Sequence, residues 1–234
     1  MSELKKVLIS RPEYDEIVPS TGQQIKILPY KVADEKLLLI AAESKNTQQM
    51  AKALKKLIGN NSEGIDVEEL ETYDLEYLFL KLRGVSVGEV SRFKMKCTEC
   101  DHYTDVEVDL NDVTVKKDDD FTNIIKVDDN LGFEMKQLSI EEALNANTED
   151  PGEVLKLVAR SVKTVFYGDD TITVGKAEQA DLLEIIESLT TAQFNNFRNF
   201  FSKQPRVYHD LDFECSNCSH QNHAPLEGLP AFFQ

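Results

Sequence analysis

Residues 94–108 read KMKCTECDHYTDVEV, and residues 212–226 read DFECSNCSHQNHAPL. All four cysteines of the chain lie in these two stretches, as the pairs Cys97–Cys100 and Cys215–Cys218. In each stretch a strand-like run enters a tight Cys-x-x-Cys turn, and a polar or alternating run leaves it. We call each such turn, with the runs on either side of it, a knuckle. Two knuckles that face each other can supply four thiolates to one tetrahedrally coordinated ion. We therefore predict a zinc ribbon with a Cys₄ site.

A four-thiolate site is coordinatively saturated, so the predicted zinc is structural and leaves no position for a reactive water. The alternatives are free thiols or disulfides, and redox catalysis by a Cys-x-x-Cys pair. Disulfides within each pair would be strained, and a redox Cys-x-x-Cys needs a thioredoxin-like βαβ context that is absent here. His220 and His223 follow the second knuckle and could replace a thiolate. Because four cysteines are already present, we expect both histidines on the surface.

The two halves of the predicted site are far apart in the chain, with 114 residues between Cys100 and Cys215. A metal would then join two distant segments and frame the insert between them. The fold class expected is α+β and mainly helical, with two helical halves joined by a split Cys₄ zinc ribbon of short antiparallel strands. The expected parts are an N-terminal helical region with a short β-hairpin (1–90), the split ribbon with an apolar tail (91–110 plus 204–234) and an acidic, mainly helical insert (111–203).

Apolar periodicity and capping signals place the secondary structure. Gly84 is expected to stop the third helix, and Ser139 and Thr190 each open a capping box. Helices are expected over 32–46, 47–58, 73–83, 153–167 and 177–189, and from 190 to the proline at 205. Strands are expected over 24–29, 121–127, 131–138 and 207–213.

Two apolar features could bind a partner. Phe194, Phe197, Phe200 and Phe201 form one helical ridge, for which core packing is the favoured interpretation and a partner-binding face the alternative. The ending, PLEGLPAFFQ, is too apolar for a free tail and should dock on its own ribbon or on another protein. The partner-binding candidates are Phe194, Phe197, Phe201, Leu226, Leu229, Phe232 and Phe233.

Composition limits the function classes. The chain has 234 residues, 41% of them hydrophobic and 29% charged, which suits a packed, soluble fold. No stretch approaches the ~18–20 apolar residues of a membrane span, and no signal peptide is recognised, so a reducing cytoplasm is expected. The net charge is −16, which argues against nucleic acid as a partner. Arg92, Lys94 and Lys96 share one strand face before the first knuckle, and we expect that face to be solvated.

No catalytic motif is present. The sequence contains no Walker loop, dinucleotide-binding fingerprint, nucleophile elbow or His-Glu-x-x-His. Its four histidines cluster around the knuckles, and none stands near an obvious nucleophile in the sequence. We therefore expect a protein that is not an enzyme.

Several short sequence segments, taken together, resemble the T4-type bacteriophage baseplate hub assembly proteins. Pro19-Ser20-Thr21-Gly22 leads to ILPYKVADEKLLLIAAES, and DLEYLFLKLRGVSVGE (74–89) precedes the first knuckle. LTTAQFNNFRNFF (189–201) lies before a proline and the second knuckle, and LEGLPAFF belongs to the ending. The order of these segments, over most of the chain, carries the resemblance.

The resemblance implies a non-enzymatic assembly factor that acts as a chaperone for hub and spike components or for the tape measure. It would work in the host cytoplasm during assembly. One alternative is a permanent structural subunit of the baseplate hub in the virion, and a second is a nucleic-acid-binding zinc-ribbon regulator. No catalytic residues and no oligomeric state follow from the resemblance.

Overall fold

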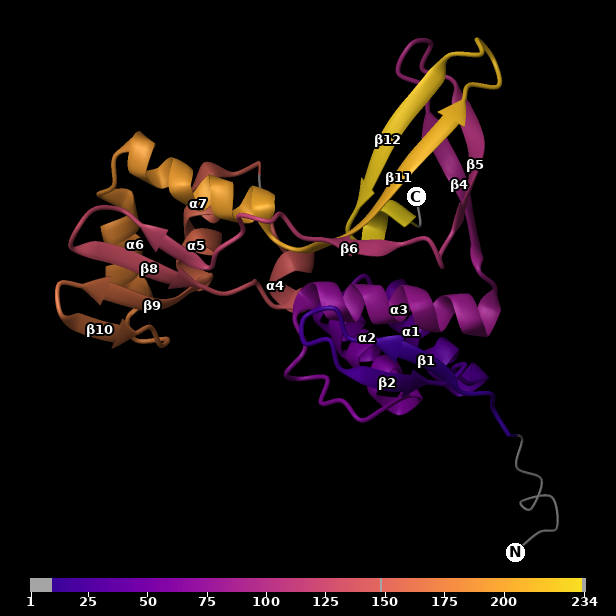
Figure 1. Ribbon diagram of the computed structural model, residues 1–234, viewed down its shortest axis with the longest axis horizontal. Coiled ribbons are helices and arrows are strands. Elements are labelled where there is room, and N and C mark those ends of the chain that lie inside the picture. The colour runs from indigo at the N-terminus through magenta and orange to yellow at the C-terminus, as the bar shows by residue number, and fades with distance from the viewer. Residues whose placement is uncertain (1–9, 148, 233–234) are drawn as a thin grey trace, which may run out of the picture. The chain divides into compact units, whose positions relative to one another are not determined.

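The computed structural model describes residues 10–147 and 149–232, and no side chain is described for residue 144. The chain forms two compact units. We call the first the ribbon unit; it contains the described residues up to 115 and from 207 onward. We call the second the insert unit; it contains residues 116–206. Figure 1 follows the chain from the ribbon unit through the insert unit and back.

The ribbon unit begins with a small antiparallel sheet and three helices. The first two strands form the hairpin expected near the N-terminus, and its turn closes where the Gly22 N–H donates to the Val18 carbonyl at 2.8 Å. Gly22 has φ +71°, a conformation that glycine adopts without steric cost. The elements are β1 (Tyr14–Ile17), β2 (Gln24–Ile27), α1 (Val32–Glu43), α2 (Thr47–Asn61), β3 (Ser62–Glu63) and α3 (Thr72–Val87).

The third helix is longer than predicted. Gly84 lies inside α3 and does not end it, and a Cβ at this position would meet only Leu110, at 3.9 Å. The helix ends instead at Gly88, whose φ of +145° is open to glycine alone among the common residues. The expectation for Gly84 was wrong because a single glycine costs a helix only about 1 kcal/mol, which packing on both faces of α3 offsets.

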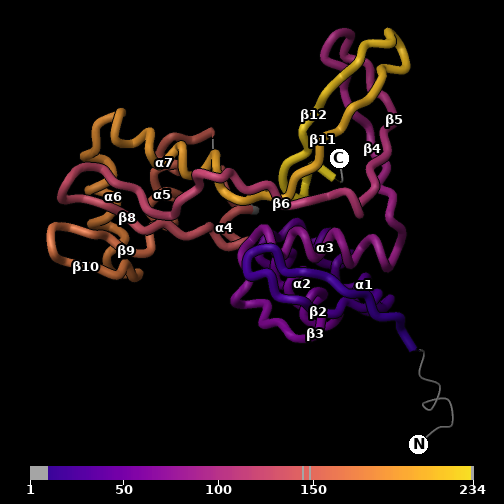
Figure 2. The backbone as a smooth tube through the Cα atoms, in the orientation of Figure 1, coloured from indigo at the N-terminus to yellow at the C-terminus, as the bar shows by residue number. Residues whose placement is uncertain are grey.

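Two hairpins, β4/β5 and β11/β12 (Figure 2), together with the short strand β6 and a 3-10 helix, complete the ribbon unit. One hairpin carries the first knuckle and the other carries the second, and the strand predicted over 207–213 is present within β11. Leu80 of α3 joins residues of both hairpins in one buried core. The elements are β4 (Val90–Lys96), β5 (Tyr103–Asp109), β6 (Thr114–Lys116), β11 (Arg206–Glu214), β12 (Gln221–Glu227) and the 3-10 helix η2 (Leu229–Phe232).

The insert unit is an antiparallel sheet of four strands in the order β10-β9-β8-β7, packed with helices. The capping boxes predicted at Ser139 and Thr190 are both present and open α4 and α7. The two strands predicted over 121–127 and 131–138 pair as expected, although each is shorter. The elements are β7 (Ile124–Lys126), β8 (Leu131–Met135), α4 (Ile140–Leu144), α5 (Pro151–Arg160), β9 (Val162–Tyr167), β10 (Asp170–Thr173), α6 (Gln179–Glu187) and α7 (Thr191–Lys203).

The expected fold class was wrong. The structure is 38% helix and 28% strand, with seven α-helices and four antiparallel sheets in the described residues, so it is mixed α/β and not mainly helical. The clearest error lies in 153–167, predicted as one helix. That segment is helical only to Arg160 and then becomes β9, a strand bonded to β8 on one side and β10 on the other. Its β-branched and aromatic residues, VKTVFY, favour a buried strand, and sheet pairing overrides the helical spacing.

Within the described residues, every helix is too short or too polar to cross a membrane.

Candidate metal centre

The two knuckles are built alike. In the first, the Cys97 N–H donates to the His102 carbonyl at 2.8 Å; in the second, the Cys215 N–H donates to the His220 carbonyl at 2.9 Å. In each knuckle the residue four positions after the first cysteine has a left-handed backbone conformation. These residues are Asp101, with φ +59°, and Ser219, with φ +58°. The short loops therefore force both sulfurs of a pair toward the same side of the turn.

The four cysteine sulfurs meet at the tips of the two hairpins. Cys97 Sγ lies 3.8 Å from Cys218 Sγ, and Cys100 Sγ lies 3.6 Å from Cys215 Sγ. All four sulfurs lie within 4.8 Å of one another, and no disulfide joins them. A regular tetrahedron with metal–sulfur bonds of about 2.3 Å has edges of about 3.8 Å. These separations match a four-thiolate ion site and are too long for disulfides, which need about 2.05 Å.

Backbone N–H groups point at the sulfurs. Glu99 N and Asn217 N each lie 3.4 Å from the first sulfur of their own knuckle, at equivalent positions. The Asn217 side-chain amide lies 3.7 Å from Cys100 Sγ, which adds a donor across the two knuckles. Donors of this kind stabilise negative sulfur and help hold thiolates close together.

The thiols influence one another's ionisation. The N–H groups of Cys218 and Asn217 lower the pKa of the Cys215 thiol to about 6. At Cys218 the His220 N–H acts to lower the pKa, but the neighbouring thiols, Cys100 foremost, and burial together raise it to about 12. Four thiolates at these distances repel one another, so they cannot all ionise without a counter-charge. A divalent cation at their centre would supply that charge.

A pair of reciprocal side-chain contacts locks the knuckles together. The Asn222 Oδ1 atom accepts from the Thr98 N–H at 3.0 Å, and the Thr104 hydroxyl accepts from the Ser216 N–H at 3.1 Å. Asn222 also places its Nδ2 atom 3.6 Å from Cys97 Sγ. Thr104 and Asn222 are equivalent, because each follows the first cysteine of its own knuckle by seven residues. The two hairpins are thus related by an approximate two-fold relation.

Sequence reasoning missed these supporting residues. Their signal was the shared spacing, since both hairpins carry a buried polar residue at the same offset from the first cysteine. Because the residue is threonine in one hairpin and asparagine in the other, sequence identity did not reveal that the two positions are equivalent. The positions acquire a role only when the second hairpin lies against the first.

Zinc, the ion predicted for these four sulfurs, is expected to bind about 10-fold to 100-fold more weakly to Asn222→Ala, because the substitution removes the bond to Thr98 and the donor to Cys97. Competition with a chromophoric chelator measures this affinity. Gln221→Ala is the matched control, since the neighbouring side chain is exposed and bonds Glu214 at 3.0 Å, away from the sulfurs. Equal affinities for both variants would show that Asn222 does not support the site.

The predicted histidine alternatives lie outside the sulfur cluster. The group of potential metal ligands found in the described residues consists of the four cysteines alone. His223 is exposed and its Nδ1 atom lies 2.9 Å from Asp212, with Nε2 3.4 Å from Asp210. The bond to Asp212 is the main cause that raises the pKa of His223 above its ordinary value. The structure therefore brings together the four predicted cysteines without an imidazole.

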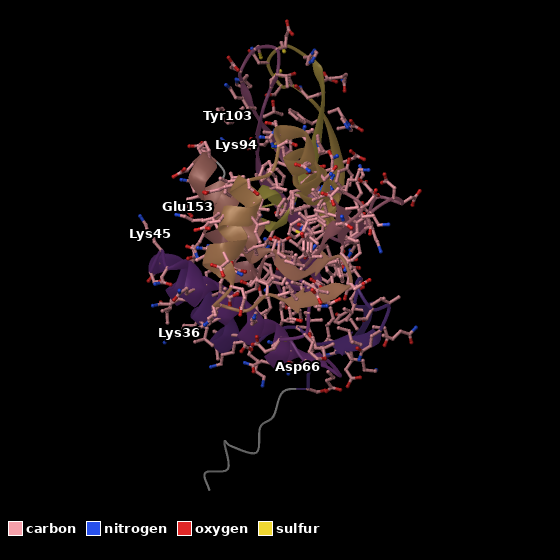
Figure 3. All side chains as sticks on the ribbon, turned by 90° about the vertical axis from the view of Figure 1, so that its left-hand side faces the viewer. Lys36, Lys45, Asp66, Lys94, Tyr103 and Glu153 are labelled. Atoms are coloured by element: carbon pink, nitrogen blue, oxygen red, sulfur yellow. The ribbon has the colours of Figure 1, made fainter. Side chains whose placement is uncertain are left out.

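The basic face before the first knuckle is neutralised by its own hairpin. Arg92 pairs with Glu107 at 2.5 Å, Lys96 pairs with Asp101 at 2.7 Å, and Lys94 lies 4.0 Å from an aspartate on β5. Lys94 and Tyr103 project from the exposed side of this hairpin (Figure 3). The exposed aromatic ring of Tyr103 belongs to β5, so the sequence of β4 alone did not indicate it. Paired cations offer little net charge to a phosphate backbone.

The phenylalanine ridge is mainly core. Phe197 is 0% exposed and Phe200 5%, and the Phe197 ring lies 5.3 Å from the Phe133 ring of β8. Phe194 and Phe201 are partly buried against the same core. Phe197 therefore cannot contact a partner in this folded form, which supports the core interpretation of the ridge.

The apolar ending packs into its own ribbon. Leu226 is 2% and Phe232 0% exposed in the core that both hairpins share with α3, and Leu229 is partly buried against it. The Ser91 hydroxyl donates to the Phe232 carbonyl at 2.7 Å. Glu76 of α3 accepts a hydrogen bond from the Leu229 N–H, and burial raises the pKa of this carboxyl to about 6. Leu226 and Phe232 are thus core residues and not a partner surface.

One residue of the predicted partner set, Phe233, lies outside the described residues.

Fold and site together define a split four-cysteine ribbon protein with an inserted α/β unit. Residues 11–234 match the family model described as T4 bacteriophage base plate protein. The chain belongs to this family, which confirms the resemblance to T4-type baseplate proteins. No curated protein and no solved structure matches the chain. The expectation that it is not an enzyme stays a prediction.

Proposed function

We propose that this baseplate-family protein is a hub assembly factor held together by a structural zinc ion. The family match over residues 11–234 is the observation that carries the baseplate assignment. In this role the protein acts as a non-enzymatic chaperone for hub and spike or tape-measure proteins in the host cytoplasm. Its net charge of −16 supports this role, because strong like charge keeps a holding factor soluble and away from DNA.

Zinc is the ion that fits the donor set best. Four soft thiolates in tetrahedral array select zinc over hard cations such as Mg²⁺ or Ca²⁺, which prefer oxygen ligands. The four sulfurs fill the coordination sphere, so the ion would stabilise the fold and supply no Lewis-acid chemistry to a substrate. Residues that would hold it are Cys97, Cys100, Cys215 and Cys218.

The partner surface must use side chains that reach solvent. Of the predicted set, Phe194 and Phe201 of α7 and Leu229 of η2 are partly buried and retain exposed area. The Arg198 guanidinium lies 5.6 Å from the centre of the Phe194 ring. An aromatic ring flanked by arginine is a common anchor in protein interfaces. Phe194 is therefore the first residue of the proposed contact.

The experiment is affinity capture of the full-length, zinc-loaded protein from infected cells, with identification of the proteins that come along. Hub, spike or tape-measure proteins are expected with the unaltered protein. Their recovery is expected to fall at least ~10-fold with Phe194→Glu. Asn199→Glu on the same helix is the matched control, because Asn199 is exposed and lies outside the packed ridge.

Purified virions separate the two roles of a baseplate protein. An assembly factor is absent from the mature particle, whereas a structural subunit is present in a fixed ratio to known baseplate components. Quantitative mass spectrometry that finds the chain at such a ratio would overturn the chaperone proposal and establish the structural alternative.

A further inference from the structure

Helix α1 (Val32–Glu43) exposes apolar side chains that the described residues of the ribbon unit leave uncovered. Val32 is 81% exposed, Leu39 59% and Ile40 51%. Isolated exposed leucines are ordinary on protein surfaces, but Leu39 and Ile40 are adjacent, and Val32 lies seven residues before Leu39 on the same short helix.

The opposite side of α1 is buried within the ribbon unit. Its buried residues are Asp34 and Ala41. The Asp34 carboxylate accepts hydrogen bonds from the side-chain amides of Asn60 at 3.0 Å and Asn61 at 3.2 Å, both at the C-terminal end of α2. These bonds fix the rotation of α1 about its axis, so the exposed side is set by the fold.

The exposed side carries an ordered stripe. At 100° per residue, Val32, Lys36, Leu39 and Glu43 fall within one narrow face, with Ile40 beside them. Lys36 projects outward from the helix in the side view (Figure 3). Neither Lys36 nor Glu43 has an ion-pair partner in the part of the chain that the structure describes.

This stripe is complementary to itself. If two α1 helices run antiparallel about a two-fold axis midway between Leu39 and Ile40, each residue faces the one equally far from the centre. Lys36 of one copy then faces Glu43 of the other, twice, and Leu39 faces Ile40, whereas Val32 lies beyond the paired part of the helix and faces Thr47 at the start of α2. Glu35 faces the neutral Ser44, so no like charges are brought together. A two-fold interface requires such self-complementarity.

We infer that α1 is the contact surface for a second copy of this chain, in an antiparallel helix pair. The inference is independent of the zinc ion and of the hub partners proposed above. A helix of 12 residues is about 18 Å long and buries less than the ~800 Å² per partner of a standard interface. The dimer is therefore expected to dissociate in the micromolar range.

Sedimentation velocity of the full-length, zinc-loaded protein from about 1 to about 300 µM tests the inference. The average mass is expected to rise from monomer toward dimer over this range. Leu39→Glu should remain monomeric throughout, with its helix content unchanged by circular dichroism. Ile172→Glu is the matched control, because Ile172 is 48% exposed on β10 of the insert unit and should leave dimerisation intact.

Charge exchange tests the antiparallel geometry itself. Lys36→Glu and Glu43→Lys are each expected to weaken the dimer about tenfold, because each replaces two attractive pairs by two repulsive ones. The double variant K36E/E43K restores both pairs and should recover the original dissociation constant to within about twofold.

Three outcomes would overturn the inference. These are a monomer at every concentration, a double variant no stronger than either single one, and an Ile172→Glu variant as monomeric as Leu39→Glu. If the protein is monomeric but Leu39→Glu loses a co-purifying baseplate protein, α1 is a contact for that different protein and the self-association is wrong.

Discussion

Cys215→Ser is expected to abolish tight zinc binding and to unfold the ribbon at the tips of both hairpins. Cys215 is buried, its thiol has the pKa lowered to about 6, and its sulfur lies 3.6 Å from Cys100 Sγ. A serine hydroxyl at this position cannot act as a thiolate ligand, and three thiolates bind zinc far less tightly than four.

The loss should reach the fold because the site joins segments that are 114 residues apart. Structural zinc contributes apparent binding energies of about 10–16 kcal/mol in small peptides, whereas whole domains are stable by only about 5–15 kcal/mol. We therefore expect the free energy of unfolding of the ribbon unit to fall by about 5 kcal/mol or more. Metal analysis and thermal unfolding measure the two effects.

His220→Ala is the control for the cysteine variant, since His220 contributes its backbone carbonyl to the second knuckle and lies outside the ligand group. It should keep one zinc per chain and a nearly unchanged melting temperature. A Cys215→Ser protein that still carries a full equivalent of zinc would show that the four sulfurs are not the ligands. Wild-type protein purified without any zinc would refute the metal centre as a whole.

Phe232→Ala is expected to destabilise the ribbon unit by about 3–5 kcal/mol. The Phe232 ring is 0% exposed in a core shared with Leu80 of α3, Val207 of β11 and Leu226 of β12. Removing the ring leaves a cavity whose lining loses its contacts, because the surrounding strands cannot collapse fully into the space. Denaturant unfolding of the zinc-loaded protein measures the loss.

Phe232→Leu is the graded control, because leucine fills most of the same space and should cost less than half as much. A loss below about 1 kcal/mol for the alanine variant would show that the ending is dispensable to the core. Reduced partner capture by Phe232→Ala would follow from unfolding alone, so this variant cannot test a partner contact. Phe194, which is only partly buried, is the better position for that purpose.

Local signals in the sequence predicted local structure well. The capping boxes at Ser139 and Thr190 and the strand leading to the second knuckle are all present. Each capping box depends on residues that are neighbours along the chain, and β11 pairs with β12 across the short turn of the second knuckle. The same reasoning failed for 162–167, where pairing with strands on both sides decides between helix and strand.

Partner surfaces were harder to predict than the cluster of four cysteines. Periodicity identified Phe197 as one member of a ridge, and composition marked Phe232 as part of an apolar ending, but neither signal says what covers a side chain. In the structure both are fully buried. The exposed apolar side of α1 escaped notice because apolar residues lie all around that helix, and only its packing on α2 shows which ones remain outside.

The sequence by itself determined that two Cys-x-x-Cys turns exist and that each directs two thiols to one side, because both facts depend on a few adjacent residues. Tertiary structure alone decided that the turns meet with sulfurs 3.6 and 3.8 Å apart and that Thr104 and Asn222 bond across the join. It also decided that the apolar ending fills the core beneath them. These contacts join segments more than 100 residues apart, and no local spacing encodes which distant surface a side chain will meet.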